Sequence, residues 1–344
     1  MASVNIEKWG SNEKIVKIVL ENEYLKAEIS TLGAALVALN LKKTADQRDI
    51  VCGLKSPDDY LNHDKYLGAT VGRVAGRIDA GRFVLNGREY TLAQNNNGNA
   101  LHGGIKGFDR KVFSYEILRM DNDAASVKLS IISLDMEEGY PGNLMLDVIY
   151  EIVNNRLSVR YEGRTDGDTL INITNHSYFN LNGHNGHSIK DHSLRVKSEE
   201  ILKIDEDGCA RGERLKVEKT PFDFREYKLI GNALCQAHEQ IVKGNGIDHY
   251  FIFNGDNSQI ELLSPDSKIK MTVDSDQLGA NIYTANYLND LIGKDNVLYT
   301  PRCSICFECQ DYVNDININA EPGTVLRVGE KYTACTNYIF EVKE

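Results

Sequence analysis

Four ionisable side chains stand beside glycine, asparagine or aromatic residues in short strand-like segments: His102, His176, Asp248 and Glu308. A carboxylate and an imidazole can serve together as the general base and general acid of a proton-transfer reaction. Asparagine, arginine and tyrosine side chains nearby suit a polyhydroxylated ligand, because each hydroxyl needs a hydrogen-bond partner once water is removed. Spacing along the chain does not by itself bring the four residues together.

The histidine with the most informative surroundings is His176, within residues 171–181. The segment begins with β-branched and apolar residues and is predicted to be a strand. It then reaches Asn175, His176 and the aromatic pair Tyr178 and Phe179. Such surroundings suit an imidazole that acts as an acid or base, and they suit a structural histidine at a strand end equally well.

A glycine-rich segment, residues 68–78, contains Arg73 and Arg77. Neither G-x-G-x-x-G spacing nor a following Lys-Ser/Thr is present, so the segment is not a phosphate-binding loop. Its small residues favour a loop that lets guanidinium groups reach a ligand, and a turn with solvated arginines is the alternative. The sequence His102-Gly103-Gly104 is similar to an esterase oxyanion loop, but a G-x-S-x-G nucleophile motif is missing.

Three cysteines, Cys303, Cys306 and Cys309, have the spacing of iron–sulfur cluster ligands. The residues around them predict a strand, in which Cys303 and Cys309 would share one face and Cys306 would lie on the other. Three thiolates in that arrangement cannot converge on one metal ion, so we expect no cluster.

Two further segments have partial metal-binding patterns. His184, His187 and His192 supply enough imidazoles for zinc, although they lie in a polar loop without a nearby cysteine. The segment that begins at Asp205 starts like a calcium loop, but its twelfth position is Lys216 rather than glutamate. We therefore expect no metal site, with the histidine cluster as the alternative.

Composition narrows the class of protein. The chain has 344 residues and a net charge of −11, which argues against a nucleic-acid partner. The apolar run at 33–41 is too short to cross a bilayer, so no membrane association is expected. Seven cysteines without a secretory leader predict free thiols in a reducing compartment, the cytoplasm.

The elements that must position these residues are mostly short strands. Arg82 to Leu92 predicts a hairpin with its turn at Asn86-Gly87, and Ser56-Pro57 predicts a helix start. Helical periodicity is weak elsewhere and is best at 234–242. We therefore predict one all-β antiparallel sandwich domain spanning residues 1–344. Apolar and alternating runs predict strands at 16–20, 25–29, 34–41, 112–118, 126–134, 144–153, 156–163, 193–197, 200–204, 250–254, 259–263, 269–273, 281–284, 305–308, 325–328 and 338–342.

Eight short motifs occur along nearly the whole chain: GRVAGRI (72–78), NALHGG (99–104), KGFD (106–109), EGYPG (138–142), TNHSYFNL (174–181), GIDH (246–249), YTAN (283–286) and CFECQ (306–310). They resemble the motifs of the aldose 1-epimerase (galactose mutarotase) family and occur in the family's order. Each motif alone is weakly specific, whereas the ordered set is highly specific.

The resemblance implies a large antiparallel β supersandwich with few short helices, an open sugar-binding cleft and no cofactor. It implies an enzyme that interconverts the α and β anomers of free hexoses such as galactose or glucose, by opening and closing the sugar ring. Glu308, ionised at the start, would be the general base, and His176, charged at the start, the general acid. Arg73, His102, Asp248, Asn281 and Tyr178 would contact the hexose, and Asn175 and Tyr178 would orient the imidazole of His176. The protein is expected to be a monomer or a weak homodimer.

Several positions depart from the family pattern. Gly72 stands where an asparagine is usual before the arginine, and Arg302 and Ser304 replace a histidine and a glycine. The proline-rich segment after the glutamate appears at 313–319 largely without its prolines. These differences bear on the preferred sugar more than on the reaction type. Three alternatives stay open: a hexose-phosphate epimerase, a non-catalytic sugar-binding module and a glycosidase that uses Asp248 and Glu308.

Overall fold

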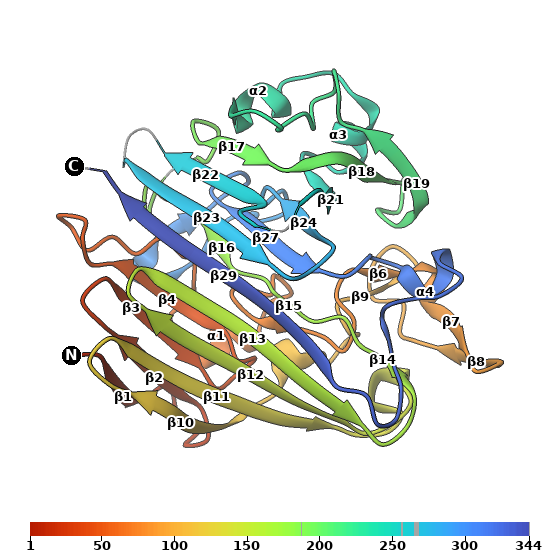
Figure 1. Ribbon diagram of the computed structural model, residues 1–344, viewed down its shortest axis with the longest axis horizontal. Coiled ribbons are helices and arrows are strands. Elements are labelled where there is room, and N and C mark those ends of the chain that lie inside the picture. The colour runs from red at the N-terminus through yellow and green to blue at the C-terminus, as the bar shows by residue number, and fades with distance from the viewer. Residues whose placement is uncertain (187, 256, 265–267, 344) are drawn as a thin grey trace.

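The computed structural model describes residues 1–186, 188–255, 257–264 and 268–343, and antiparallel sheets dominate it (Figure 1). The largest sheet has nine strands, of which β12, β13 and β29 run diagonally across Figure 1. In β29, buried and more exposed residues alternate, because one face of the sheet covers the core and the other meets solvent. In sheet order the strands are β10 (Ser114–Met120), β11 (Ala124–Ser133), β12 (Leu144–Val153), β13 (Arg156–Thr165), β29 (Tyr332–Val342), β23 (Ile269–Ser275), β22 (Ile260–Ser264), β17 (Ser193–Val196) and β20 (Lys228–Leu229).

A six-stranded sheet and a four-stranded sheet lie against this large sheet, and the main hydrophobic core contains residues of all three. The six-stranded sheet contains β16 (Tyr178–Phe179), β27 (Ile305–Gln310), β24 (Gly279–Tyr283), β21 (Asp248–Phe253), β18 (Ser198–Ile204) and β19 (Ala210–Lys216), in that order. The four-stranded sheet contains β1 (Ser3–Lys8), β2 (Val16–Glu21), β3 (Leu25–Ser30) and β4 (Leu36–Leu41).

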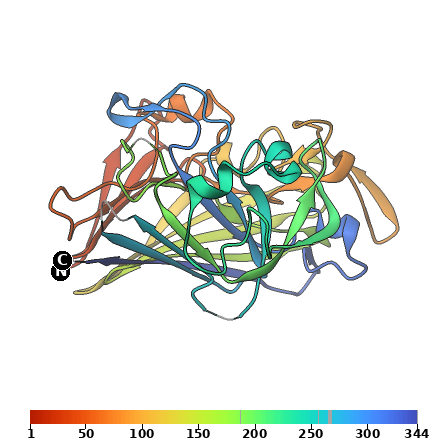
Figure 2. The same ribbon diagram turned by 90° about the horizontal axis from the view of Figure 1, so that it is seen from above.

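Shorter elements and loops lie on the opposite side from the long strands, as Figure 2 shows. Five two-stranded pieces pair β5 (Thr70–Val71) with β15 (Thr174–Asn175), β6 (Arg77–Ile78) with β9 (Ala100–Leu101), β7 (Arg82–Leu85) with β8 (Arg88–Thr91), β14 (Thr169–Leu170) with β28 (Val325–Leu326), and β25 (Leu291–Ile292) with β26 (Leu298–Tyr299). The helices are α1 (Pro57–Leu61), α2 (Ile230–Leu234), α3 (Glu239–Lys243) and α4 (Asp315–Ile318), and the 3₁₀ turns are η1 (Asp79–Gly81), η2 (Phe108–Arg110), η3 (Glu137–Gly139) and η4 (Lys294–Asn296).

Local predictions held where the sequence signal was strong. The β7–β8 hairpin turns at Asn86-Gly87, both with positive φ, and the side chain of Ser56 caps α1. The all-β antiparallel prediction is confirmed. The helical candidate at 234–242 is only partly right: residues 239–242 lie in α3, but residues 235–238 separate α3 from α2, and His238 caps α3.

The three spaced cysteines are all free and buried. Cys306 and Cys309 lie on β27, but Cys303 precedes the strand and packs in the same hydrophobic cluster as Cys306. The prediction that Cys303 and Cys309 lie on the same face of one strand is therefore wrong, because the strand begins only at Ile305. Cys309 packs in the main core instead.

Candidate active site

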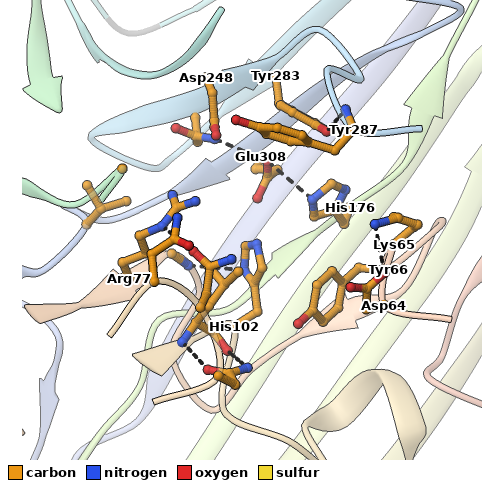
Figure 3. A pocket seen from close by; sticks show the side chains of 18 of the residues that line it. Asp64, Lys65, Tyr66, Arg77, His102, His176, Asp248, Tyr283, Tyr287 and Glu308 are labelled. Atoms are coloured by element: carbon orange, nitrogen blue, oxygen red, sulfur yellow. Dashed lines mark hydrogen bonds and ion pairs between the residues drawn. The ribbon is translucent and has the colours of Figure 1, made fainter. Parts of the chain in front are cut away.

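A cavity of about 580 Å³ lies between strands of the six-stranded sheet and several loops, and both polar and aromatic side chains line it (Figure 3). Arg77, His102, His176 and Glu308 surround a common space in that view. Four of the predicted site residues besides His176 and Glu308 line the cavity: His102, Asp248, Asn281 and Tyr178.

Three neighbouring strands place the carboxylates. Glu308 on β27 stands opposite Asn281 on β24, and Asp248 begins the adjoining β21. The side-chain amide of Asn281 donates to Asp248 Oδ1 at 2.9 Å and to Glu308 Oε1 at 3.3 Å. The sheet register thus gives two carboxylates a shared hydrogen-bond donor, although they are 60 residues apart in sequence.

His176 lies between β15 and β16, with its backbone hydrogen-bonded on both sides to the 68–69 segment. Its Nε2 is 3.6 Å from Glu308 Oε1, and the two side chains are only 5% and 1% exposed. Among the described residues, His176 Nδ1 and Glu308 Oε2 have no hydrogen-bond partner. Leaving buried polar atoms unpaired is costly, so a hydroxyl-bearing ligand would be favoured here.

A backbone hydrogen bond fixes the tautomer of His102, which lines the cavity. Its Nδ1 accepts a hydrogen bond from the backbone N–H of Gly76 at 3.2 Å, so the proton of the neutral ring is on Nε2. Burial lowers the pKa of His102 well below its usual value, which keeps the ring neutral. His102 is therefore a neutral hydrogen-bond donor.

Burial also shifts the pKa values of Glu308 and His176. It raises the pKa of Glu308 to about 8, with nearby Asp248 as the second cause, and lowers the pKa of His176 to about 4. Both shifts favour the uncharged forms, in which Glu308 carries its proton and the imidazole of His176 is neutral. The direction of both shifts runs against the expectation that Glu308 is ionised and His176 charged at the start, because neither charge is solvated in the free protein.

The ligand atoms of His102, His176 and Glu308 all lie within 4.8 Å of one another, so a metal ion has to be considered. A metal ligand nitrogen must be deprotonated. His102 can bind metal through Nε2 only if it gives up the hydrogen bond from Gly76. The donor set thus suits a hydroxyl-rich ligand better than a cation.

Arg73 is not a ligand-binding residue in this structure, which corrects the prediction. The side chain is 2% exposed and does not line the cavity. Its two terminal nitrogens donate to Thr169 Oγ1, to Ser133 Oγ and to four carbonyls, those of Pro141, Gly142, Ser133 and Leu134. Arg73 therefore holds the 133–142 segment in place.

Arg77 is the arginine that reaches the cavity. Its Nε donates to Asn96 Oδ1 at 3.0 Å, and no ion pair forms between it and any described carboxylate. Gly76 precedes it, lines the cavity and has a φ of +75°. Gly72 instead packs in the interior, where an added Cβ would lie 2.6 Å from Ile173 and Phe108. Of the glycines that directly precede the two arginines, Gly76 therefore lines the cavity and Gly72 does not.

Tyr178 and Asn175 have different roles. The ring of Tyr178 stacks on His176 with centroids 5.0 Å apart, and its hydroxyl donates to the carbonyl of Lys65. The carbonyl of Lys65 thus takes the only proton of that hydroxyl, and the stacked ring supports the prediction that Tyr178 orients the imidazole. The amide of Asn175 bonds to Gly68 and Tyr150, so its prediction as an orienting group is not supported.

The other singled-out residues lie outside the cavity lining. Arg302 donates to the carbonyl of Asn245, and Ser304 is fully buried. Both ring nitrogens of His184 have partners, Tyr299 and Asp295. Both ring nitrogens of His192 also have partners, Leu181 and Asp191. His187 falls outside the described residues.

Other lining residues were not predicted as site residues: Asp109 and Tyr283 lie in the matching motifs KGFD and YTAN, whereas Tyr66, Asn96 and Tyr287 lie outside all the motifs. Burial raises the pKa of Asp109 to about 6. The lining loops lack hydrophobic periodicity, so only the tyrosine and asparagine content around the glycine-rich segments could have indicated them.

Fold and site together define an all-β protein with a polar cavity built for acid–base chemistry on a hydroxyl-rich ligand. The family model described as Aldose 1-epimerase matches residues 16–338. The chain therefore belongs to the aldose 1-epimerase family.

Individual relatives agree with this assignment. The chain is 34% identical to human galactose mutarotase over 351 residues, covering 99% of this chain and 100% of the human one. It is 32% identical to aldose 1-epimerase of Haemophilus influenzae, covering 94% and 95% of the two chains. The crystal structure of galactose 1-epimerase from Lactobacillus acidophilus superposes with a TM-score of 0.90 at 31% identity, covering 100% of both chains. In the described part of the chain, no helix is long and apolar enough to cross a bilayer.

Proposed function

We propose that this protein is an aldose 1-epimerase that interconverts the α and β anomers of free hexoses such as galactose or glucose. The observation that carries the proposal is the buried pair of Glu308 and His176, 3.6 Å apart in a polar cavity. Membership of the family and the names of its relatives support the same reaction.

In the proposed reaction, Glu308 takes the proton of the anomeric hydroxyl while His176 gives a proton to the ring oxygen. The bond between C1 and the ring oxygen breaks, and the electron pair of the hydroxyl oxygen forms the aldehyde. Rotation about C1–C2 and the reverse proton transfers close the ring as the other anomer. No electrons leave the sugar, so acid–base groups suffice, each contributing about 10²–10⁴-fold.

The proton arrangement in the free cavity adds one step. Glu308 starts protonated and His176 neutral, so one proton must move from the carboxyl to the imidazole before Glu308 can act as base. The transfer leaves the total charge of the pair unchanged. Asn281, which donates to Glu308 and Asp248, stabilises the ionised carboxylate.

Substrate contacts follow from the lining residues. His102 donates through Nε2, Asp248 accepts, and Arg77 presents a guanidinium that is not neutralised by a carboxylate. The two other cations of the cavity wall are paired, Lys65 with Asp64 and Arg110 with Asp109. Arg77 is thus the one unpaired cation among the described lining residues, and one cation binds a phosphate dianion weakly, so the unphosphorylated hexose is the better substrate.

Polarimetry with freshly dissolved α-D-galactose tests the proposal. The wild-type protein should accelerate the change in rotation above the spontaneous rate, and Glu308→Gln should abolish the acceleration. The exposed Glu218→Gln serves as a matched control that retains it. Binding of galactose without acceleration would instead indicate a sugar-binding module.

Two further assays separate the remaining alternatives. Faster conversion of galactose 6-phosphate than of galactose would indicate a hexose-phosphate epimerase. Release of nitrophenol from a nitrophenyl galactoside would indicate a glycosidase that uses Asp248 and Glu308.

We also propose a single domain over residues 1–344, a monomer or weak homodimer, in the cytoplasm. The main hydrophobic core takes residues from Ala2 to Phe340, which supports one domain. Seven free cysteines support a reducing compartment. Light scattering behind size-exclusion chromatography tests the oligomeric state, and fractionation of cells tests the compartment.

A further inference from the structure

Tyr66 contacts both imidazoles of the site, although no sequence motif indicated it. Its ring centroid lies 4.7 Å from that of His102, edge to face, and 5.9 Å from that of His176, nearly parallel at 25°. The two imidazoles themselves are 5.4 Å apart, edge to face. Tyr66 thus packs against the proposed general acid and against the neutral donor (Figure 3).

The segment that carries Tyr66 is held by side chains of the cavity wall. Arg110 donates to the carbonyls of Leu61 and His63, and the Tyr178 hydroxyl donates to that of Lys65 at 2.8 Å. Three carbonyls in five residues are therefore fixed by tertiary hydrogen bonds. Such anchoring resists displacement of the next residue, Tyr66.

The backbone and hydroxyl of Tyr66 point to a role beyond filling space. Its φ is +53°, in the left-handed region that bulky residues rarely adopt and that is found where surrounding structure imposes it. Among the described residues, no hydrogen bond to its hydroxyl is formed, and the residue lines the cavity. Burial raises the pKa of this phenol, so it remains a neutral donor.

We propose that Tyr66 is a positioning residue for the epimerase reaction: its ring holds the imidazoles of His102 and His176 and shields them from water, and its hydroxyl binds a hydroxyl of the hexose. This role rests on the proposed function of the same cavity. The ring acts through the imidazoles, whereas the hydroxyl acts on substrate binding, so the two can be separated by substitution.

Shielding from water has a measurable consequence at His176. Burial is the largest cause of its lowered pKa, so loss of the Tyr66 ring should move that pKa upward, toward the ordinary value. The titratable and aromatic groups that face this imidazole are Tyr66, His102, Tyr178, Asp248, Tyr283 and Glu308.

The experiment compares Tyr66→Phe and Tyr66→Leu with wild type and with Tyr115→Leu, a control at an exposed tyrosine of β10. Polarimetry gives kcat and KM for galactose, and NMR titration gives the pKa of His176, assigned with the spectrum of His176→Gln. Tyr66→Phe should raise KM about 3–10-fold with kcat within twofold, because the lost contact stabilises the bound substrate and the transition state equally. Tyr66→Leu should lower kcat about tenfold or more and raise the pKa of His176 by about one or more.

The proposal is overturned if Tyr66→Leu keeps kcat within twofold or leaves the His176 pKa at its wild-type value. A lower melting temperature with unchanged kcat, KM and pKa would show a merely structural role and would overturn it as well. If Tyr66→Leu does not fold, Tyr66→Met fills the volume without an aromatic plane and takes its place. If wild type fails to accelerate mutarotation, the proposed function fails, and the His176 titration still decides the role of the ring.

Discussion

Replacing Glu308 by glutamine should stabilise the folded protein at neutral and alkaline pH while it removes the activity. The carboxyl is 1% exposed, and its pKa is about 8 in the folded chain against an ordinary value of 4.5. The folded chain thus holds this proton more tightly than the unfolded chain. The stability that the group contributes is full below pH 4.5 and is lost as pH rises toward 8.

The size of the effect follows from the same two pKa values. Each pKa unit is worth about 1.4 kcal/mol, so the full difference corresponds to about 5 kcal/mol above pH 8. Water that enters the cavity when the carboxylate ionises reduces this figure. Glutamine does not titrate, so the advantage of Glu308→Gln should grow by roughly 2–4 kcal/mol between pH 5.5 and 8.5.

Urea unfolding of wild type and Glu308→Gln at pH 5.5, 7 and 8.5 measures this advantage, because other groups titrate alike in both chains. The free energy of unfolding of the exposed Glu218→Gln should stay parallel to wild type at all three pH values. An advantage of Glu308→Gln that does not change with pH would refute the view that burial holds the proton on Glu308.

Three further predictions concern the same site. The kcat/KM of wild type should be bell-shaped in pH with limbs near 4 and 8, since the pair must hold one proton, and a profile without the alkaline limb would contradict it. His176→Ala should lower kcat about 10²–10⁴-fold in polarimetry with the melting temperature maintained, and a loss under tenfold would exclude a general acid at this position. Arg77→Ala should raise KM in enzyme kinetics with little change in the free energy of unfolding. Arg73→Ala should lower the free energy of unfolding in urea by about 3 kcal/mol or more, because it leaves buried carbonyls unpaired. The reverse pattern would restore Arg73 as the ligand-binding residue.

Prediction from sequence worked best where the signal is local. Alternation located long strands such as β12 and β13, and Asn86-Gly87 located a hairpin, because side-chain period and turn geometry depend on neighbouring residues. It was only partly right at 234–242, where weak periodicity did not reveal the break between α2 and α3.

The two arginines of the glycine-rich segment show the limit at the site. Arg73 and Arg77 are four residues apart among similar neighbours, and nothing local distinguishes them. Acceptors from the 133–142 segment and Thr169 draw Arg73 into the interior, and these come from 60 to 96 residues away. Arg77 has no such partners and extends into the cavity.

The sequence by itself determined the all-β class, the family and the identity of the carboxylate and imidazole, since ordered motifs and strand periodicity are properties of the chain. The tertiary structure alone decided that Glu308 and His176 meet, that burial favours the uncharged form of each, and that Tyr66 packs against both imidazoles. Convergence and desolvation depend on how distant segments pack, and no local pattern records either of them.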